Sequence, residues 1–166
     1  LKGAVNDARS FQEFLTDSRE LGGLQVPPSC IRVLKNEEAT RSTILSAFDS
    51  HLLNNPNIFE DGTAAMILYF AGHGSRVASP GNLLSPDARV EVICPVDERT
   101  PGPDGEMVAA IPDYTLAQRL QKLAVRKGNN ITVILDSCHS EGMQRAPVNA
   151  KAKPHEAVST RPAGSG

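Results

Sequence analysis

The hydrophobic positions of this chain follow two patterns, one helical and one typical of buried strands. Three segments place apolar residues three or four positions apart, as on one face of a helix. The stripes are Ala4, Ala8, Phe11 and Leu15; Ile44, Phe48 and Leu52; and Leu116, Leu120, Leu123 and Ala124. Thr40 can cap the second helix and Asp113 the third, while Gly128 ends the third. We therefore predict three amphipathic helices.

Short apolar runs lie between these helices, at residues 31–34, 64–70, 90–94 and 131–135. The second and fourth runs show no polar alternation, which is typical of strands buried on both faces of a parallel sheet. Because helices and strands alternate, we predict an α/β fold: a three-layer α-β-α sandwich around a mostly parallel central sheet. The chain opens on a helix with no strand before it, so we infer that the first strand is missing and that Leu1 lies inside a larger domain.

The chain divides into one folded domain, residues 1–143, and a flexible linker or tail, residues 144–166. The tail is rich in Ala, Pro, Ser, Lys and Gly and has no apolar periodicity. The net charge of −2 and the absence of tryptophan give no support for nucleic-acid binding. No apolar run approaches the roughly 20 residues of a membrane span. Three cysteines without CxxC spacing fit a reducing compartment, and we expect a cytoplasmic protein.

Two of the predicted strands run into chemically reactive residues. The strand at 64–70 leads to His73 between Gly72 and Gly74, and the strand at 131–135 leads to Asp136 and Cys138. If the strands are parallel neighbours, histidine and cysteine arrive at the same edge of the sheet. An imidazole there can take the thiol proton and later protonate a leaving amine. If each residue is considered separately, the structural alternative for the cysteine is a small buried hydrophobic residue, and that for the histidine is an ordinary loop residue.

The sequences YFAGHGS and LDSCHS closely resemble the histidine and cysteine motifs of caspase-like cysteine peptidases, specifically the metacaspases. KGAVNDARSF, and ICPVDE followed by IPDYTLAQRL, are similar to further family segments. The resemblance spans about residues 1–143 and implies a cysteine endopeptidase with His73 and Cys138 as its catalytic dyad. It also implies an oxyanion hole formed by the backbone N–H groups of Gly74 and Cys138. Protein or peptide substrates are implied, as is a small-subunit region of the same full-length chain that completes the sheet.

The resemblance further implies an acidic specificity pocket that selects arginine or lysine, with Asp7 and Asp136 as the matching acids. Two carboxylates in one pocket favour a cation, and a guanidinium can satisfy both through charge-assisted hydrogen bonds. The structural alternatives are a strand-end acid that bonds nearby amides at Asp136, and a first-turn helix acid at Asp7.

Several positions depart from the family pattern. Ala4 and Ala71 replace a frequent cysteine and serine of the pocket, and Glu141 replaces a glycine three residues after the nucleophile. A carboxylate near the thiol tends to raise the thiol pKa. These departures support an alternative function, a weakly active or inactive scaffold or regulatory module of a multidomain protein. A redox-sensing thiol is a minor alternative.

No cofactor is expected to be required. The calcium-binding stretch of many metacaspases corresponds to residues 87–91, where Asp87 and Glu91 match but Arg89 and Val90 do not. Because calcium prefers about six to eight oxygen ligands, we expect calcium activation to be weak or absent. A zinc site built from His73, Cys138 and His139 would lack a fourth ligand, so we predict no metal site.

Overall fold

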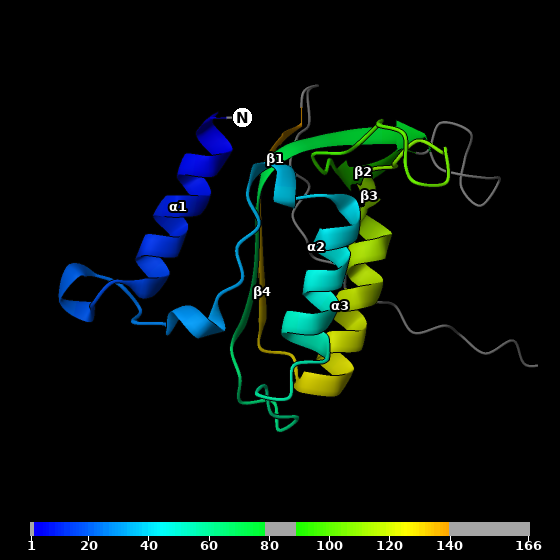
Figure 1. Ribbon diagram of the computed structural model, residues 1–166. Helices are drawn as coiled ribbons and strands as arrows, with labels where there is room; N and C mark the ends of the chain where they lie inside the picture. Colours follow the sequence, from blue (N-terminus) through cyan, green and yellow to red (C-terminus); the bar gives the residue numbers. More distant parts are fainter. Residues whose placement is uncertain (1, 79–88, 140–166) are drawn as a thin grey trace, which may run out of the picture.

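The computed structural model describes residues 2–78 and 89–139, in which helices cover both faces of a four-stranded sheet (Figure 1). The helix at Lys2–Thr16 lies on one face, and the helices at Arg41–Phe48 and Asp113–Lys127 lie on the other. The helices are α1 (Lys2–Thr16), α2 (Arg41–Phe48), its π-helical continuation η4 (Asp49–Leu53) and α3 (Asp113–Lys127), with short 3-10 turns at Arg19–Leu21, Pro28–Cys30 and Asn36–Glu38. The strands are β1 (Met66–Ala78), β2 (Arg89–Ile93), β3 (Ile111–Pro112) and β4 (Ile131–His139). The predicted three-layer α/β arrangement is confirmed.

The sheet has the strand order β3-β2-β1-β4 and is mixed. β1 and β4 run parallel, as expected for the two uniformly apolar runs, whereas β2 pairs antiparallel with both β1 and β3. β1 is long because its two halves have different partners. Residues 66–74 pair with β4, and residues 74–78 pair with β2. The longest strand therefore passes through the middle of the sheet and joins its parallel and antiparallel parts.

The predicted helices are present, and their apolar stripes face the sheet. Thr40 caps α2 as predicted, since its hydroxyl accepts a hydrogen bond from the Thr43 N–H at 3.2 Å. The predicted cap of α3 is wrong by one position: Pro112 occupies the cap and Asp113 is the first helical residue. Its carboxylate accepts a hydrogen bond from the Tyr114 N–H at 2.6 Å, a favourable place for a negative charge.

The strand predicted at residues 31–34 is not formed. Ile31 has extended dihedral angles, but this segment pairs with no strand among the residues that the structure describes. The Ile31 N–H instead donates a local turn hydrogen bond to the Pro28 carbonyl at 3.1 Å. An extended backbone becomes a strand only when a neighbour supplies hydrogen-bond partners, and β propensity alone does not provide one.

The core lies between the sheet and the helices α2 and α3. One buried cluster joins Phe48, Met66 and Leu123, and a second joins Ile93, Ile111 and Leu116. Leu123 is completely buried. The residues that the sequence placed inward on the second and third helices therefore form the main hydrophobic contact of the fold.

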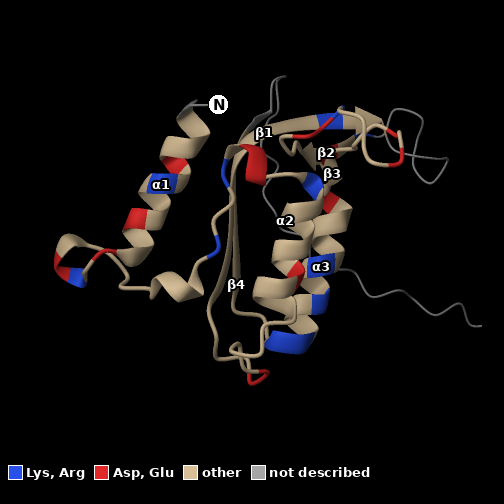
Figure 2. Ribbon diagram, viewed as in Figure 1, with Lys and Arg blue, Asp and Glu red and all other residues tan. Residues whose placement is uncertain are grey.

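Figure 2 shows basic and acidic residues alternating along α1, whereas along α3 a single acid, Asp113, is followed by Arg119, Lys122, Arg126 and Lys127. None of the described helices has the length and apolar character that crossing a membrane requires. The proposed tail, residues 144–166, lies outside the described residues.

Candidate active site

His73 and Cys138 occupy paired positions on neighbouring parallel strands. The register begins with Met66 opposite Ile131 and continues without a break to His73 opposite Cys138. The two positions therefore lie side by side near the carboxyl end of the parallel β1–β4 pairing, the side on which ligands bind in open parallel sheets. The side chains of Cys138 and His139 lie outside the description, so the pairing is a statement about the backbone.

The expected ends of these two strands are wrong. β1 continues past residue 70 through the AGHGS motif to Ala78, and β4 continues past residue 135 to His139. The candidate residues are therefore held in the sheet itself and not in loops that follow it. The backbone of His73 has a neighbour on each side. It pairs with β4 on one side, and on the other its carbonyl accepts a hydrogen bond from the Cys94 N–H at 2.9 Å. Its side chain is exposed.

Strand alternation separates the core residues of β1 from the candidate site. Met66, Leu68 and Phe70 pack on the α2 and α3 side of the sheet. Tyr69 lies on the other side, where its ring stacks on Phe11 of α1 with centroids 4.4 Å apart. Since side chains alternate along a strand, position 73 belongs with position 69 to the α1 face.

Asp136 reaches the same face from β4. The Tyr69 hydroxyl donates a hydrogen bond to Asp136 Oδ2 at 3.4 Å, although 67 residues separate them along the chain. Burial raises the pKa of Tyr69, and the negative charges of Asp136 and Asp7 raise it further. Asp7 and Asp136 are the two acids that the sequence analysis assigned to one pocket. Their charges thus both raise the pKa of the same hydroxyl group.

Tyr69 is a residue that the sequence analysis missed. It stands inside the run AAMILYF, which was interpreted as a uniformly apolar strand. The available signal was its phenol group, because a tyrosine in a buried run places a polar tip that needs a partner. That partner comes from a distant strand and could not be named from spacing.

The glycines on either side of His73 occupy confined positions. A Cβ atom at Gly74 would lie 3.0 Å from Ser137 Oγ, and one at Gly72 would lie 2.8 Å from the end of the Phe70 ring. Gly72 was expected to let the backbone approach closely, but its space is filled by a side chain of its own strand. At Gly74 the tight contact is across to Ser137 of β4, so a side chain at this position would crowd the strand that carries Cys138.

Cys94, at the end of β2, is the other cysteine near this edge. Burial raises the pKa of its thiol to about 11, and a hydrogen bond with Glu98 acts in the same direction. A thiol with this pKa is protonated near neutral pH and is a poor nucleophile. The Cys94 side chain is therefore not suited to the chemistry that the motif suggests for Cys138.

The Pro-x-Asp loop at residues 95–97 anchors the start of α2. Asp97 accepts a hydrogen bond from the Arg41 N–H at 2.8 Å, and the Val96 N–H donates to the Ala39 carbonyl at 3.0 Å. The carboxylate satisfies one of the free N–H groups in the first turn of the helix. The role of this Asp in the described residues is thus structural.

The stretch compared with a calcium loop is described only in part, since Asp87 lies outside the described residues. Glu91 forms an ion pair with Arg76 at 3.3 Å, and Val90 is buried. Among the side chains that the structure describes, which do not include those of Cys138 and His139, no three His, Cys, Asp or Glu groups gather in a way that could hold a metal ion.

Ala4 and Ala71, the two pocket departures, lie near the acids. Ala71 pairs with Asp136 in the ladder, and Ala4 lies on α1 one turn before Asp7. Neither can supply the thiol or hydroxyl group that is frequent in the family. Glu141 lies outside the described residues.

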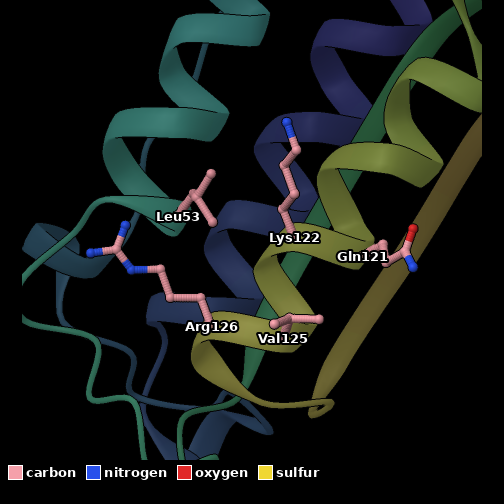
Figure 3. Close-up of a pocket in the computed structure, with 5 residues that line it drawn as sticks. All are labelled: Leu53, Gln121, Lys122, Val125 and Arg126. Carbon is pink, nitrogen blue, oxygen red and sulfur yellow. The ribbon is translucent and has the colours of Figure 1, made fainter.

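A shallow hollow elsewhere on the molecule carries none of the candidate residues. Figure 3 shows it between η4 and the last turns of α3, lined by Leu53, Gln121, Lys122, Val125 and Arg126. In Figure 1 this end of α3 leads into the start of β4, whereas Asp136 lies near the other end of β4, and His73 of β1 pairs with position 138 there. The hollow is therefore separate from the candidate active site.

Comparison with known proteins agrees with the fold and the motifs. A family model described as the caspase domain matches residues 1–164. No curated protein and no solved structure matches the chain. The family match covers nearly the whole chain and is independent of the register described above. The chain therefore belongs to the caspase domain family of cysteine peptidases.

Proposed function

We propose that the protein is a metacaspase-like cysteine endopeptidase that cleaves peptide bonds after arginine or lysine. The observation that carries this proposal is the register of β1 and β4, which sets His73 opposite Cys138 on neighbouring parallel strands. Asp7 and Asp136 support the preference for basic residues, because both charges act on the Tyr69 hydroxyl from the same face of the sheet.

In the proposed reaction, His73 takes the proton of the Cys138 thiol, and the thiolate attacks the carbonyl carbon of the scissile bond. The N–H groups of Gly74 and Cys138 receive the oxyanion, and each such donor is worth about 2.7–4 kcal/mol in comparable sites. His73 then gives its proton to the leaving amine as the C–N bond breaks. Water, activated by the same imidazole, hydrolyses the thioester and restores the thiol.

The proposed pocket is selective by charge. Two carboxylates that approach each other repel, and a guanidinium or ammonium group relieves this repulsion while it forms charge-assisted hydrogen bonds. An aspartate side chain in the same place would add a third negative charge. The proposal therefore includes discrimination against substrates that end in aspartate.

We also propose that a small-subunit region completes the sheet along β4. β4 is one of the two edge strands of the described sheet, and Leu135 on it is 49% exposed although it is a large apolar residue. An open edge with apolar side chains is a surface that another strand can cover. No cofactor enters the proposed reaction, and added calcium is expected to change the rate little.

The experiment that tests the function uses two peptide reporters, one ending in arginine and one in aspartate. We expect the protein to cleave the arginine reporter only, and Cys138→Ala to lower kcat by at least about 10³-fold. Cys30→Ala is the matched control, because Cys30 is exposed and far along the chain from the motif. An arginine reporter that the protein leaves intact, or that Cys138→Ala cleaves equally well, contradicts the proposal.

The alternative function is a caspase-like scaffold with little catalysis. It is favoured by Ala4 and Ala71, which supply no polar group beside the acids. Labelling with an electrophilic arginine mimic separates the two functions. A Cys138 thiol that reacts rapidly supports the peptidase, and one that is inert supports the scaffold.

A further inference from the structure

The Tyr69 hydroxyl lies where three separate elements meet. Its own strand, β1, lies in the middle of the sheet, Asp136 comes from β4, and Asp7 comes from α1. The Tyr69 ring stacks on Phe11 of α1 with an interplanar angle of 16°. Asp7 and Phe11 are four residues apart in one helix, so they lie on the same side of it. The aromatic contact therefore also brings Asp7 toward the sheet.

Asp136 is exposed, so packing by neighbouring side chains does not hold its carboxylate in one orientation. An unrestrained exposed carboxylate samples several rotamers, and ordering it when a ligand binds lowers the affinity. A hydrogen bond from Tyr69 to Oδ2 restricts the rotation of the carboxylate and leaves Oδ1 available to another donor. Ala71, paired with Asp136 in the ladder, cannot supply this bond.

We propose that Tyr69 is a positioning residue of the basic pocket. Its hydroxyl holds the Asp136 carboxylate in the orientation that receives the cationic substrate side chain, and its ring sets the separation of Asp136 from Asp7 through Phe11. This inference rests on the proposed function, because it assigns the two acids to substrate recognition. Tyr69 acts through Asp136 and does not touch the reacting atoms.

The electrostatic surroundings keep Tyr69 in the form that this role requires. Burial and the two nearby carboxylates raise the pKa of the phenol above its usual value of about 10. The group is consequently neutral over the working range of a neutral-pH enzyme, and it donates its proton in the hydrogen bond. An ionised phenolate would have no proton to donate and would repel Asp136.

A purely structural role predicts a different result for one substitution. Tyr69→Phe keeps the ring and its stacking on Phe11 but removes the hydroxyl. If Tyr69 only packs against α1, this variant behaves like the wild type. If Tyr69 positions Asp136, KM for the arginine reporter rises about fivefold to tenfold, while kcat changes less than about twofold. Tyr114→Phe is the matched control, since the exposed Tyr114 lies on α3 on the other face.

A binding measurement keeps the test independent of turnover. The same substitutions are made in Cys138→Ala, and the Kd of a fluorescent peptide ending in arginine is compared with that of one ending in citrulline, a neutral isostere. We expect Tyr69→Phe to raise the Kd of the arginine peptide about fivefold to tenfold and to leave the weaker citrulline binding unchanged. Circular dichroism checks that each variant is folded.

The outcomes separate the two proposals. Arginine-peptide KM and Kd values that Tyr69→Phe leaves unchanged, while Asp136→Asn raises them, overturn the role of Tyr69 and leave the proposed function standing. An equal loss of affinity for arginine and citrulline peptides also overturns it, because it indicates a structural defect. If the wild-type protein binds the arginine peptide but cleaves nothing, catalysis fails as a proposal and the Kd values still decide the role of Tyr69. If it neither binds nor cleaves the peptide, both proposals are wrong.

Discussion

The two faces of the central sheet differ in how they are packed and in what they carry. On the α2 and α3 face, Leu123 and Ile111 are completely buried and the clusters around them are continuous with the helices. On the α1 face, the Tyr69 ring stacks on Phe11 of α1, and the side chains of His73 and Asp136 are exposed. The polar candidate residues Tyr69 and Asp136 lie on this second face.

This difference indicates a division of roles within one sheet. Burial of apolar surface is the main source of folding stability, so the α2 and α3 face should contribute most of it. A face that is less completely packed can present polar groups without burying them unpaired. Substitutions on the two faces should therefore affect different measurements: unfolding on one face and substrate recognition on the other.

The largest effect on stability is expected for Leu123→Ala. The side chain is 0% exposed and packs with Phe48 and Met66, so its truncation leaves a cavity in the principal core. We expect the free energy of unfolding, measured by urea denaturation, to fall by about 2–5 kcal/mol. Val125→Ala, on the same helix at 85% exposure, is the control and should change it little. Similar losses for both variants would contradict the division between the faces.

A smaller loss is expected for Lys127→Met, at the end of the same helix. Lys127 is 3% exposed, and its ammonium group donates to the carbonyls of Asn55 and Ile58 at 3.3 and 2.7 Å. Methionine keeps the apolar stem but leaves these carbonyls without their donor. We expect thermal or urea unfolding to show a loss of about 1–3 kcal/mol. The exposed Lys122, changed to Met in the same way, should leave stability unchanged, and an equal effect of the two would exclude the carbonyl contacts as its cause.

The smallest effect on stability is expected on the α1 face, for Phe11→Leu. The change removes the stacking on Tyr69, which is worth about 0.5–1.5 kcal/mol beyond the apolar area. We expect a loss of this size in urea unfolding, together with a higher KM for the arginine reporter because α1 carries Asp7. Phe59→Leu is the control, because Phe59 is 69% exposed and belongs to neither the Phe11–Tyr69 nor the Phe11–Phe14 ring pair. A loss of stability as large as that of Leu123→Ala would show that both faces contribute equally to folding.

Local patterns were sufficient to predict the helices. The stripes of α1, α2 and α3 and the Thr40 cap depend on residues three or four positions apart, and contacts at that range are present in any helix that forms. The parallel pairing of β1 with β4 was also expected, because both runs lack polar alternation. These features required no knowledge of distant segments.

Strand lengths could not be predicted in the same way. β1 extends to Ala78 because β2 pairs with its second half, and the segment at 31–34 is not a strand because no described strand pairs with it. A ladder is a property of two segments, so the composition of one does not determine it. The apolar run placed the end of the strand at residue 70. It gave no sign that the strand continues through His73, because that continuation depends on pairing with β2 and β4.

The candidate site shows the same limit. The resemblance of the motifs to caspase-like peptidases named Asp7 and Asp136, and it named His73 and Cys138 together with their places at the ends of two predicted strands; these roles stay predictions. Tyr69 was not named, since its importance comes from Asp136 on a strand 67 residues away and from a ring on α1. The protonated state of Cys94 likewise depends on burial, which neighbouring residues in the sequence do not reveal.

The sequence by itself determined the helices and the three-layer class, because these follow from short-range periodicity, and the resemblance of its motifs named the candidate site residues. Only the tertiary structure decided which strands exist, where they end and which polar groups meet on the α1 face. The physical reason is that hydrogen-bond ladders, burial and charge interactions act between segments far apart in the chain. His73 opposite Cys138, and Tyr69 acted on by Asp7 and Asp136, are products of those interactions.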